Sequence, residues 1–121
     1  MAPEQLEQGI NFFNSGRYFE AHEVWEGMWR EEQGPLRLFL QGLIQAAVGL
    51  HHLSRNNPVG AQSQLAKSLA KLSQYPAETE RIDVVRLRRE LEEIVANAGT
   101  GNRQIKICYV SYDPANNDIA D

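Results

Sequence analysis

Histidine, glutamate and glutamine side chains recur at helical spacing in a part of the chain that is otherwise strongly apolar. His22 and Glu26 are four residues apart, which places both side chains on one face of a helix. Gln41, Gln45 and His52 fall on one stripe of the apolar segment that follows. A polar group in a protein interior costs free energy unless a partner satisfies it. We therefore expect a hydrogen-bonded network or a binding site where the two stripes meet.

Imidazole and carboxylate groups at this spacing are also ligands for a divalent metal ion. The candidate metal ligands are His22, Glu26 and His52. The order His22-Glu23-x-x-Glu26 resembles the zinc-protease pattern H-E-x-x-H with its second histidine replaced, and Glu23 then stands where the general base would be. The Glu-x-x-His repeat of di-metal helical bundles is absent from the sequence.

Three interpretations of the polar cluster stay open, and we favour the first. It is a non-catalytic binding or scaffolding module without a cofactor, in which the cluster is structural. The second is a metal-dependent hydrolase, and the third is a metal-free site for a small polar molecule. No catalytic residue is assigned, and the reaction, the ligand and the question of enzymatic activity are left open. The full cluster comprises His22, Glu23, Glu26, Gln41, Gln45 and His52.

Apolar residues recur at helical spacing along most of the chain, which predicts an all-α protein. Breaks are expected at Gly16, at Gly34-Pro35, at Asn57-Pro58 and at Tyr75-Pro76, because glycine closes helices and proline starts or ends them. The short connections favour antiparallel neighbours, so we predict an up-down bundle of about five helices without a sheet core. The expected helices cover residues 3–14, 17–33, 35–55, 58–74 and 84–98.

The third predicted helix is apolar in nearly every direction, so we expect it to be central and buried. It contains Gly42 and Gly49, each of which costs about 1 kcal/mol relative to alanine inside a helix. A close approach by another helix is the expected compensation. Asn57 and Asp83 are the expected N-terminal caps of the fourth and fifth helices.

A chain of 121 residues is expected to form one domain, which we place at residues 1–100. The segment 101–121 has a different character and is predicted to be an irregular tail. Ile105, Ile107 and Tyr109 alternate with other residues there, which indicates a short extended piece. The asparagine- and aspartate-rich last residues are expected to be frayed or disordered.

Composition and charge point to a cytoplasmic protein. Hydrophobic residues make up 42% and charged residues 23% of the chain, as in ordinary globular domains. The apolar stretch 38–53 is too short and too polar to span a bilayer, and we expect neither a signal peptide nor a membrane partner. The single cysteine, Cys108, excludes an intrachain disulfide and fits a reducing compartment.

Partners are constrained less closely. The arginines of residues 81–89 are followed by glutamates, so no dense basic face for nucleic acid is expected. A homo-oligomer is expected instead, with the fourth and fifth helices paired across a two-fold axis. No small-molecule ligand is identified from the sequence.

Two linked motifs carry a resemblance to a known family. They read Phe13-Asn14-x-Gly16-x-Tyr18-x-Glu20-Ala21-His22-Glu23-x-x-Glu26-x-x-Trp29-Arg30 and Phe39-Leu40-Gln41-Gly42-Leu43-Ile44-Gln45-x-Ala47, followed by His52. This pattern resembles the family catalogued as domain of unknown function 309, over roughly residues 10–75. The resemblance implies a small all-α domain and a role for Glu20 and Glu23, such as capping a neighbouring helix. It implies no activity, and the tail after Gly99 lies outside it.

Overall fold

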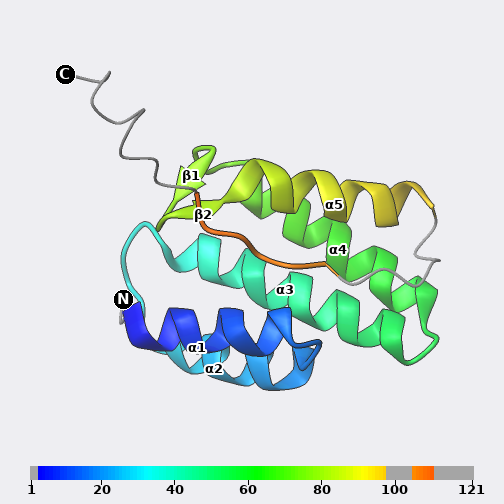
Figure 1. Ribbon diagram of the computed structural model, residues 1–121, viewed down its shortest axis with the longest axis horizontal. Helices are drawn as coiled ribbons and strands as arrows, with labels where there is room; N and C mark the ends of the chain where they lie inside the picture. Colours follow the sequence, from blue (N-terminus) through cyan, green and yellow to red (C-terminus); the bar gives the residue numbers. More distant parts are fainter. Residues whose placement is uncertain (1–2, 98–104, 111–121) are drawn as a thin grey trace.

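In the part of the chain that the structure describes, five helices run alternately in opposite directions and pack in chain order, each against the one before it (Figure 1). This computed structural model describes residues 3–97 and 105–110. The predicted all-α antiparallel bundle is confirmed. None of the helices in the described residues is long and apolar enough to cross a lipid bilayer. The helices are α1 Pro3–Asn14, α2 Tyr18–Glu31, α3 Arg37–Ser54, α4 Pro58–Leu72 and α5 Val84–Ala96.

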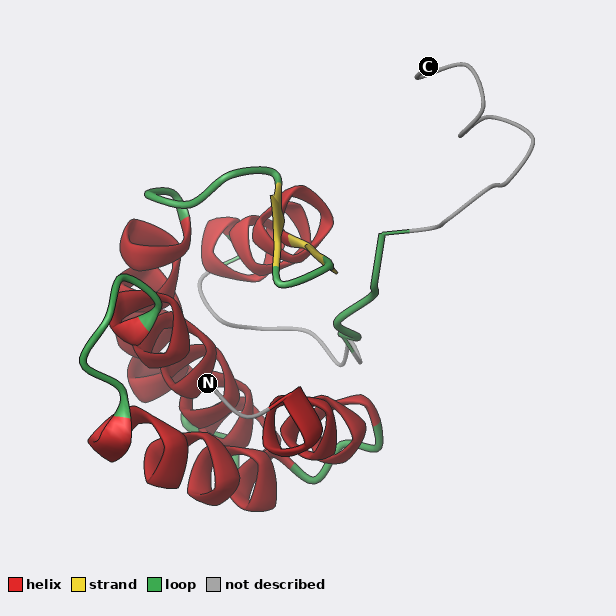
Figure 2. Ribbon diagram, turned by 90° about the vertical axis from the view of Figure 1, so that its left-hand side faces the viewer, coloured by secondary structure: helices red, strands yellow, loops and turns green. Residues whose placement is uncertain are grey.

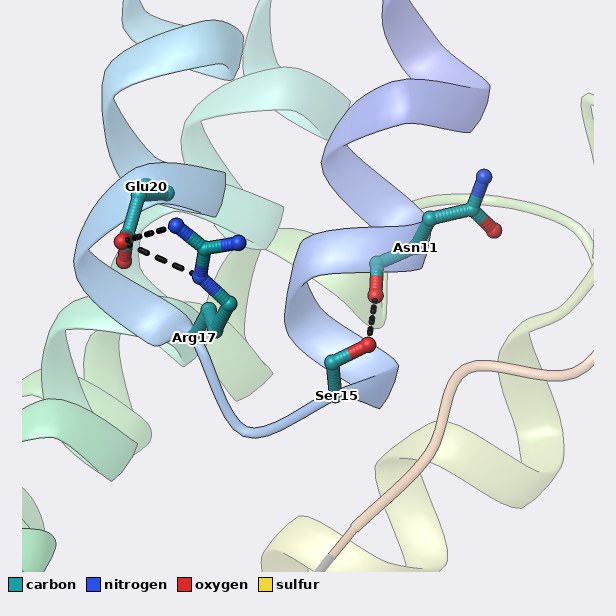
Figure 3. Close-up of polar contacts among 4 residues, drawn as sticks. All are labelled: Asn11, Ser15, Arg17 and Glu20. Carbon is teal, nitrogen blue, oxygen red and sulfur yellow. Dashed lines mark hydrogen bonds and ion pairs between the residues drawn. The ribbon is translucent and has the colours of Figure 1, made fainter.

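The helix ends follow the signals in the sequence. Gly16 closes the α1–α2 turn with a φ of 78°, and the Ser15 hydroxyl in the same turn donates to the Asn11 carbonyl (Figure 3). The Asn57 side chain accepts from the Gly60 N–H at 3.1 Å, which confirms the predicted cap of α4. The Asp83 carboxylate caps α5 in the same way, by accepting from the N–H three residues later at 3.0 Å.

The central helix is α3, which packs against α2 on one side and α4 on the other. Its two interior glycines face α4. A Cβ on Gly49 would lie 2.5 Å from Leu65 Cδ2, and one on Gly42 would lie 3.0 Å from Leu72 Cδ2. The buried Ser68 hydroxyl on α4 donates to the Gly42 carbonyl at 2.6 Å. The close approach that the glycines predict is therefore confirmed, and α4 is the helix that makes it.

A short β-hairpin joins α4 to α5, with two residues in each strand and two in the turn. It was not predicted from the sequence. Strand β1, Glu78–Thr79, pairs antiparallel with β2, Ile82–Asp83. The two turn residues, Glu80 and Arg81, have φ values of 50° and 67°. Glycine or asparagine usually occupies such positions, so the turn lacks the usual sequence signal.

The C-terminal segment 105–110 lies across the opening of the curved helix array and joins its two ends (Figure 2). The Asn14 side chain at the end of α1 donates to the Ile107 carbonyl at 2.9 Å and accepts from the Ile107 N–H at 2.7 Å. At the other end, the Asp83 N–H donates to the Cys108 carbonyl at 2.8 Å. Ile105 and Ile107 are buried in the same core as the helices.

The predicted extended piece therefore exists within the segment that the sequence sets apart as a tail. Tyr109 forms an isolated antiparallel bridge with Ile82 of the hairpin. Because its isoleucines complete the core, the segment is packed together with residues 3–97. The predicted disorder of the last residues falls on residues 111–121, which lie outside the described residues.

The α3–α4 contact makes a stability prediction with a matched control. We expect Gly49→Ala to destabilise the protein by about 1–3 kcal/mol, because the new methyl group overlaps Leu65 on α4. Gly27→Ala is the control, since a Cβ at this exposed position of α2 meets no atom within 4 Å. In dilute solution, where no second chain lies against α2, it should stabilise the protein by roughly 0.5–1 kcal/mol through helix propensity. Urea unfolding of both variants measures the effects, and equal stability changes would contradict the packing argument.

Candidate binding face on helices α2 and α3

The central helix α3 has one side that no other helix covers fully. Nine of its 18 residues are buried, by its contacts with α2 and α4 and on its inner side. Among the others, five recur every three or four residues along one side and are exposed or only partly buried. This stripe contains the three α3 residues of the predicted polar cluster. Its members are Leu38, Gln41, Gln45, Val48 and His52.

Helix α2 borders this stripe along its length. The helices are antiparallel, so the first turn of α2 lies beside the last turn of α3, with the Phe19 and His51 ring centroids 5.8 Å apart. At the other end the Arg37 guanidinium stacks on the Trp29 ring at 4.0 Å. We call this surface the α2–α3 face. It comprises Phe19, His22, Glu23, Glu26, Trp29 and Arg30 on α2, and Leu38, Gln41, Gln45, Val48 and His51 on α3.

Three charged or titratable groups of α2 form a chain along the face. The His22 Nε2 atom lies 3.0 Å from one Glu26 oxygen, and the Arg30 guanidinium donates to the other. A carboxylate only accepts hydrogen bonds, so the proton on Nε2 points to Glu26. In the neutral imidazole the second nitrogen, Nδ1, is then an acceptor. This Nδ1 is buried and has no hydrogen-bond partner among the described residues.

Two further buried polar atoms on the face are also without a partner in the described part of the chain. They are the Gln45 Oε1 acceptor and the Trp29 Nε1 donor. A buried polar group without a hydrogen bond costs about 1–3 kcal/mol. The other unpaired buried side-chain atoms belong to Arg88 and Glu90 on α5. Most atoms of this kind in residues 3–97 and 105–110 therefore gather on the α2–α3 face.

A small cavity opens where the first turn of α2 meets the last turns of α3. Its volume is about 190 Å³. Aromatic and aliphatic groups dominate its walls, and Phe19 remains 51% exposed at its rim. A cavity of this size and polarity suits one aliphatic or aromatic side chain or a small apolar molecule. The lining residues are Tyr18, Phe19, His22, Val48 and His51.

Burial shifts the pKa values of two cavity residues toward their neutral forms. Burial lowers the pKa of His51, the positive charge of Arg55 and the neighbouring imidazoles of His52 and His22 lower it further, and Glu20 opposes them. The Glu20 carboxylate accepts two hydrogen bonds from Arg17, at 2.8 and 3.1 Å, and these lower its pKa (Figure 3). Burial of Tyr18 raises the pKa of its hydroxyl, which stays neutral.

The predicted cluster is only partly assembled. His22 and Glu26 are in contact, and Gln41 and Gln45 lie on the same face, whereas the Glu23 side chain is exposed. The His52 ring instead accepts from the Asn57 amide at 3.2 Å, beside the start of α4. Among residues 3–97 and 105–110, no group of three histidine, cysteine, aspartate or glutamate side chains is placed to hold a metal ion.

The implied capping role of the α2 glutamates takes a local form. Glu20 pairs with Arg17 immediately before its own helix rather than with a neighbouring helix. A neighbouring helix does cap the end of α2: the Arg37 guanidinium donates to the Trp29 and Glu32 carbonyls at 2.6 and 2.8 Å. This contact ties the start of α3 to the end of α2, and it therefore helps to set the position of the two helices that form the face.

Four of the five cavity residues were not predicted from the sequence as site residues: Tyr18, Phe19, Val48 and His51. Phe19 was a usable signal, because it is a large apolar residue on the polar side of α2, one turn before Glu23. The structure places His51 at a partly buried position on the cavity wall.

Comparisons with known proteins confirm the resemblance. Residues 6–64 match the family model described as Domain of unknown function (DUF309), a stretch that contains the whole α2–α3 face. An uncharacterised protein of Aquifex aeolicus (strain VF5) is 28% identical over 102 residues, which are 82% of this chain and 30% of that protein. The uncharacterised protein YpuF of Bacillus subtilis (strain 168) is 38% identical over 61 residues, which are 50% of this chain and 35% of YpuF. The chain spans about a third of the length of these curated relatives.

The environment of His51 makes a prediction about its titration. We expect its pKa, followed by NMR of the imidazole, to lie below 6.5. Arg55→Gln should raise this pKa because it removes a nearby positive charge, and Glu20→Gln should lower it because it removes a negative one. The lowered pKa means that the unfolded chain binds the proton more tightly, so stability falls as the pH drops below about 6.5. If both variants shift the pKa in the same direction, the proposed arrangement of charges is wrong.

Proposed function

We propose that this domain is a non-catalytic binding module and that the α2–α3 face is its binding surface. The observation that carries the proposal is the gathering of three unpaired buried polar atoms, on His22, Trp29 and Gln45, along that face. The domain's own packing leaves few such atoms elsewhere among the described residues. A partner that hydrogen-bonds these atoms would offset the desolvation cost that they carry in the folded domain alone.

The distribution of apolar groups supports the same surface. Phe19 and Leu38 are 51% and 43% exposed at opposite ends of the face, and the cavity lies beside Phe19. Exposed aromatic and aliphatic anchors among polar groups are typical of surfaces that bind other molecules. The face therefore offers an apolar anchor point together with hydrogen-bonding groups that fix orientation.

The metal-dependent hydrolase has less support. His22 and Glu26 supply one imidazole and one carboxylate, and Arg30 already binds the same carboxylate. The third predicted ligand, His52, bonds Asn57 instead. A zinc site normally uses three or four protein ligands. The three predicted ligands therefore bond to protein side chains and do not converge on one point.

Site-specific photo-crosslinking in cells tests the binding function. We expect a benzoylphenylalanine residue replacing Phe19 to give a discrete crosslinked adduct, because position 19 lies at the rim of the cavity. The matched control is the same replacement at Val59, which is 78% exposed on α4 and lies outside the face. His22→Ala and Gln45→Ala in the position-19 protein should reduce the adduct, because each removes a hydrogen-bonding group.

If positions 19 and 38 give no adduct, or the same adducts as position 59, the α2–α3 face is not a binding surface. In that case ordered water, and not a binding partner, would satisfy the three buried polar atoms. Circular dichroism of each variant separates loss of binding from loss of the fold.

A further inference from the structure

The two ends of the α2–α3 face carry different apolar features. One end carries the apolar cavity between Phe19, Val48 and His51. The opposite end carries Leu38, an exposed leucine at the start of α3. The cavity at the first end can receive an apolar side chain, and the second end offers the exposed Leu38. A surface with this property can pair with a copy of itself turned through 180°.

Two exposed charges of opposite sign lie along α2 within the face. Glu23 lies toward the cavity end and Arg30 toward the Leu38 end, where Arg30 also contacts Glu26. Glu23 and Arg30 are seven residues apart on one side of α2, and both are exposed. When two α2 helices pair antiparallel about a point between Glu26 and Gly27, each Glu23 lies opposite the Arg30 of the second copy.

We propose that the partner of the α2–α3 face is a second copy of this chain, bound across a two-fold axis that crosses the middle of α2 and α3. This inference rests on the proposed binding function and names its partner. Leu38 of each copy enters the cavity of the other, and Glu23 pairs with Arg30 across the axis. The same rotation brings the Gln41 amide of one copy over Gln45 of the other, whose buried Oε1 lacks a donor.

Gly27 supports the central position of the axis. Glycine is disfavoured inside a helix, and Gly42 and Gly49 are explained by contacts with α4. Gly27 is exposed on α2, and a Cβ there would meet no atom of the described protein within 4 Å. Packing within the domain therefore gives no reason for this glycine. A close approach by α2 of the second copy supplies one.

Charge reversal tests the arrangement on the full chain. Wild-type protein should show a concentration-dependent monomer–dimer equilibrium in sedimentation velocity and light scattering. Glu23→Arg and Arg30→Glu should each weaken the dimer roughly tenfold or more, since each places like charges opposite one another twice in the dimer. The double variant Glu23→Arg/Arg30→Glu should recover most of the affinity, because the symmetric pairs are restored with reversed sign.

Two further variants test the cavity contact. Leu38→Ser should weaken the dimer because it removes the group that enters the cavity. Val59→Ser, the control for removing an exposed apolar side chain, should leave the dimer unchanged, since Val59 lies outside the face. Circular dichroism and urea unfolding establish that every variant is folded. Where Arg30→Glu unfolds because it also loses its contact with Glu26, Leu38→Ser and Glu23→Arg decide the question.

A chain that stays monomeric up to roughly 1 mM would overturn the proposal. So would a dimer that survives both Glu23→Arg and Leu38→Ser, which would favour the pairing through α4 and α5 expected from sequence. The crosslinking experiment keeps the two proposals distinguishable. An adduct at position 19 with twice the mass of the chain supports the second copy. An adduct of another mass in a monomeric protein retains the binding function and removes the second copy, and no adduct removes the binding function itself.

Discussion

The close approach of α3 to α4 is the constraint on which the rest of the structure depends. Gly42 and Gly49 let α4 approach α3 so closely that a methyl group at either position would crowd its leucines, and Ser68 bonds the Gly42 carbonyl across the contact. This contact occupies one side of α3, and α2 occupies the next. The orientation of α3 about its own axis is thereby set. The stripe of Leu38, Gln41, Gln45 and Val48 is the side that remains open, and it forms the α3 part of the α2–α3 face.

Much of the fold was predictable because its signals are local. The caps at Asn57 and Asp83 act within one turn of helix, and the glycines of α3 predict a close neighbour from their own cost. The hairpin was not predictable, since its turn residues, Glu80 and Arg81, adopt positive φ without the usual glycine or asparagine. The position of segment 105–110 depends on Asn14, 93 residues earlier in the chain, and no periodicity reports such a bond.

The candidate site was predicted in part for a related reason. Helical spacing alone placed His22 beside Glu26 and put Gln41 and Gln45 on one stripe of α3. It put His52 on that stripe, whereas the His51 ring, which points about 100° away on the helix, is the one that contacts Phe19 of α2. Which histidine lies toward α2 follows from the sides of α3 that its neighbours cover. His51 therefore lines the cavity, and His52 lies beside the start of α4, where it bonds Asn57.

The unpaired atoms of the face bear on whether the polar cluster serves the fold alone. A buried polar network stabilises a fold when every member has a partner, and a half-satisfied network is less favourable than apolar packing. Here Glu26 is fully engaged by His22 and Arg30, yet His22 Nδ1 and Gln45 Oε1 have no donor among the described residues. A purely structural role explains the satisfied half of the cluster and leaves the other half as a cost. A partner that brings donors and an apolar anchor accounts for both halves, and it also accounts for Leu38 and Phe19, whose exposure the fold does not require.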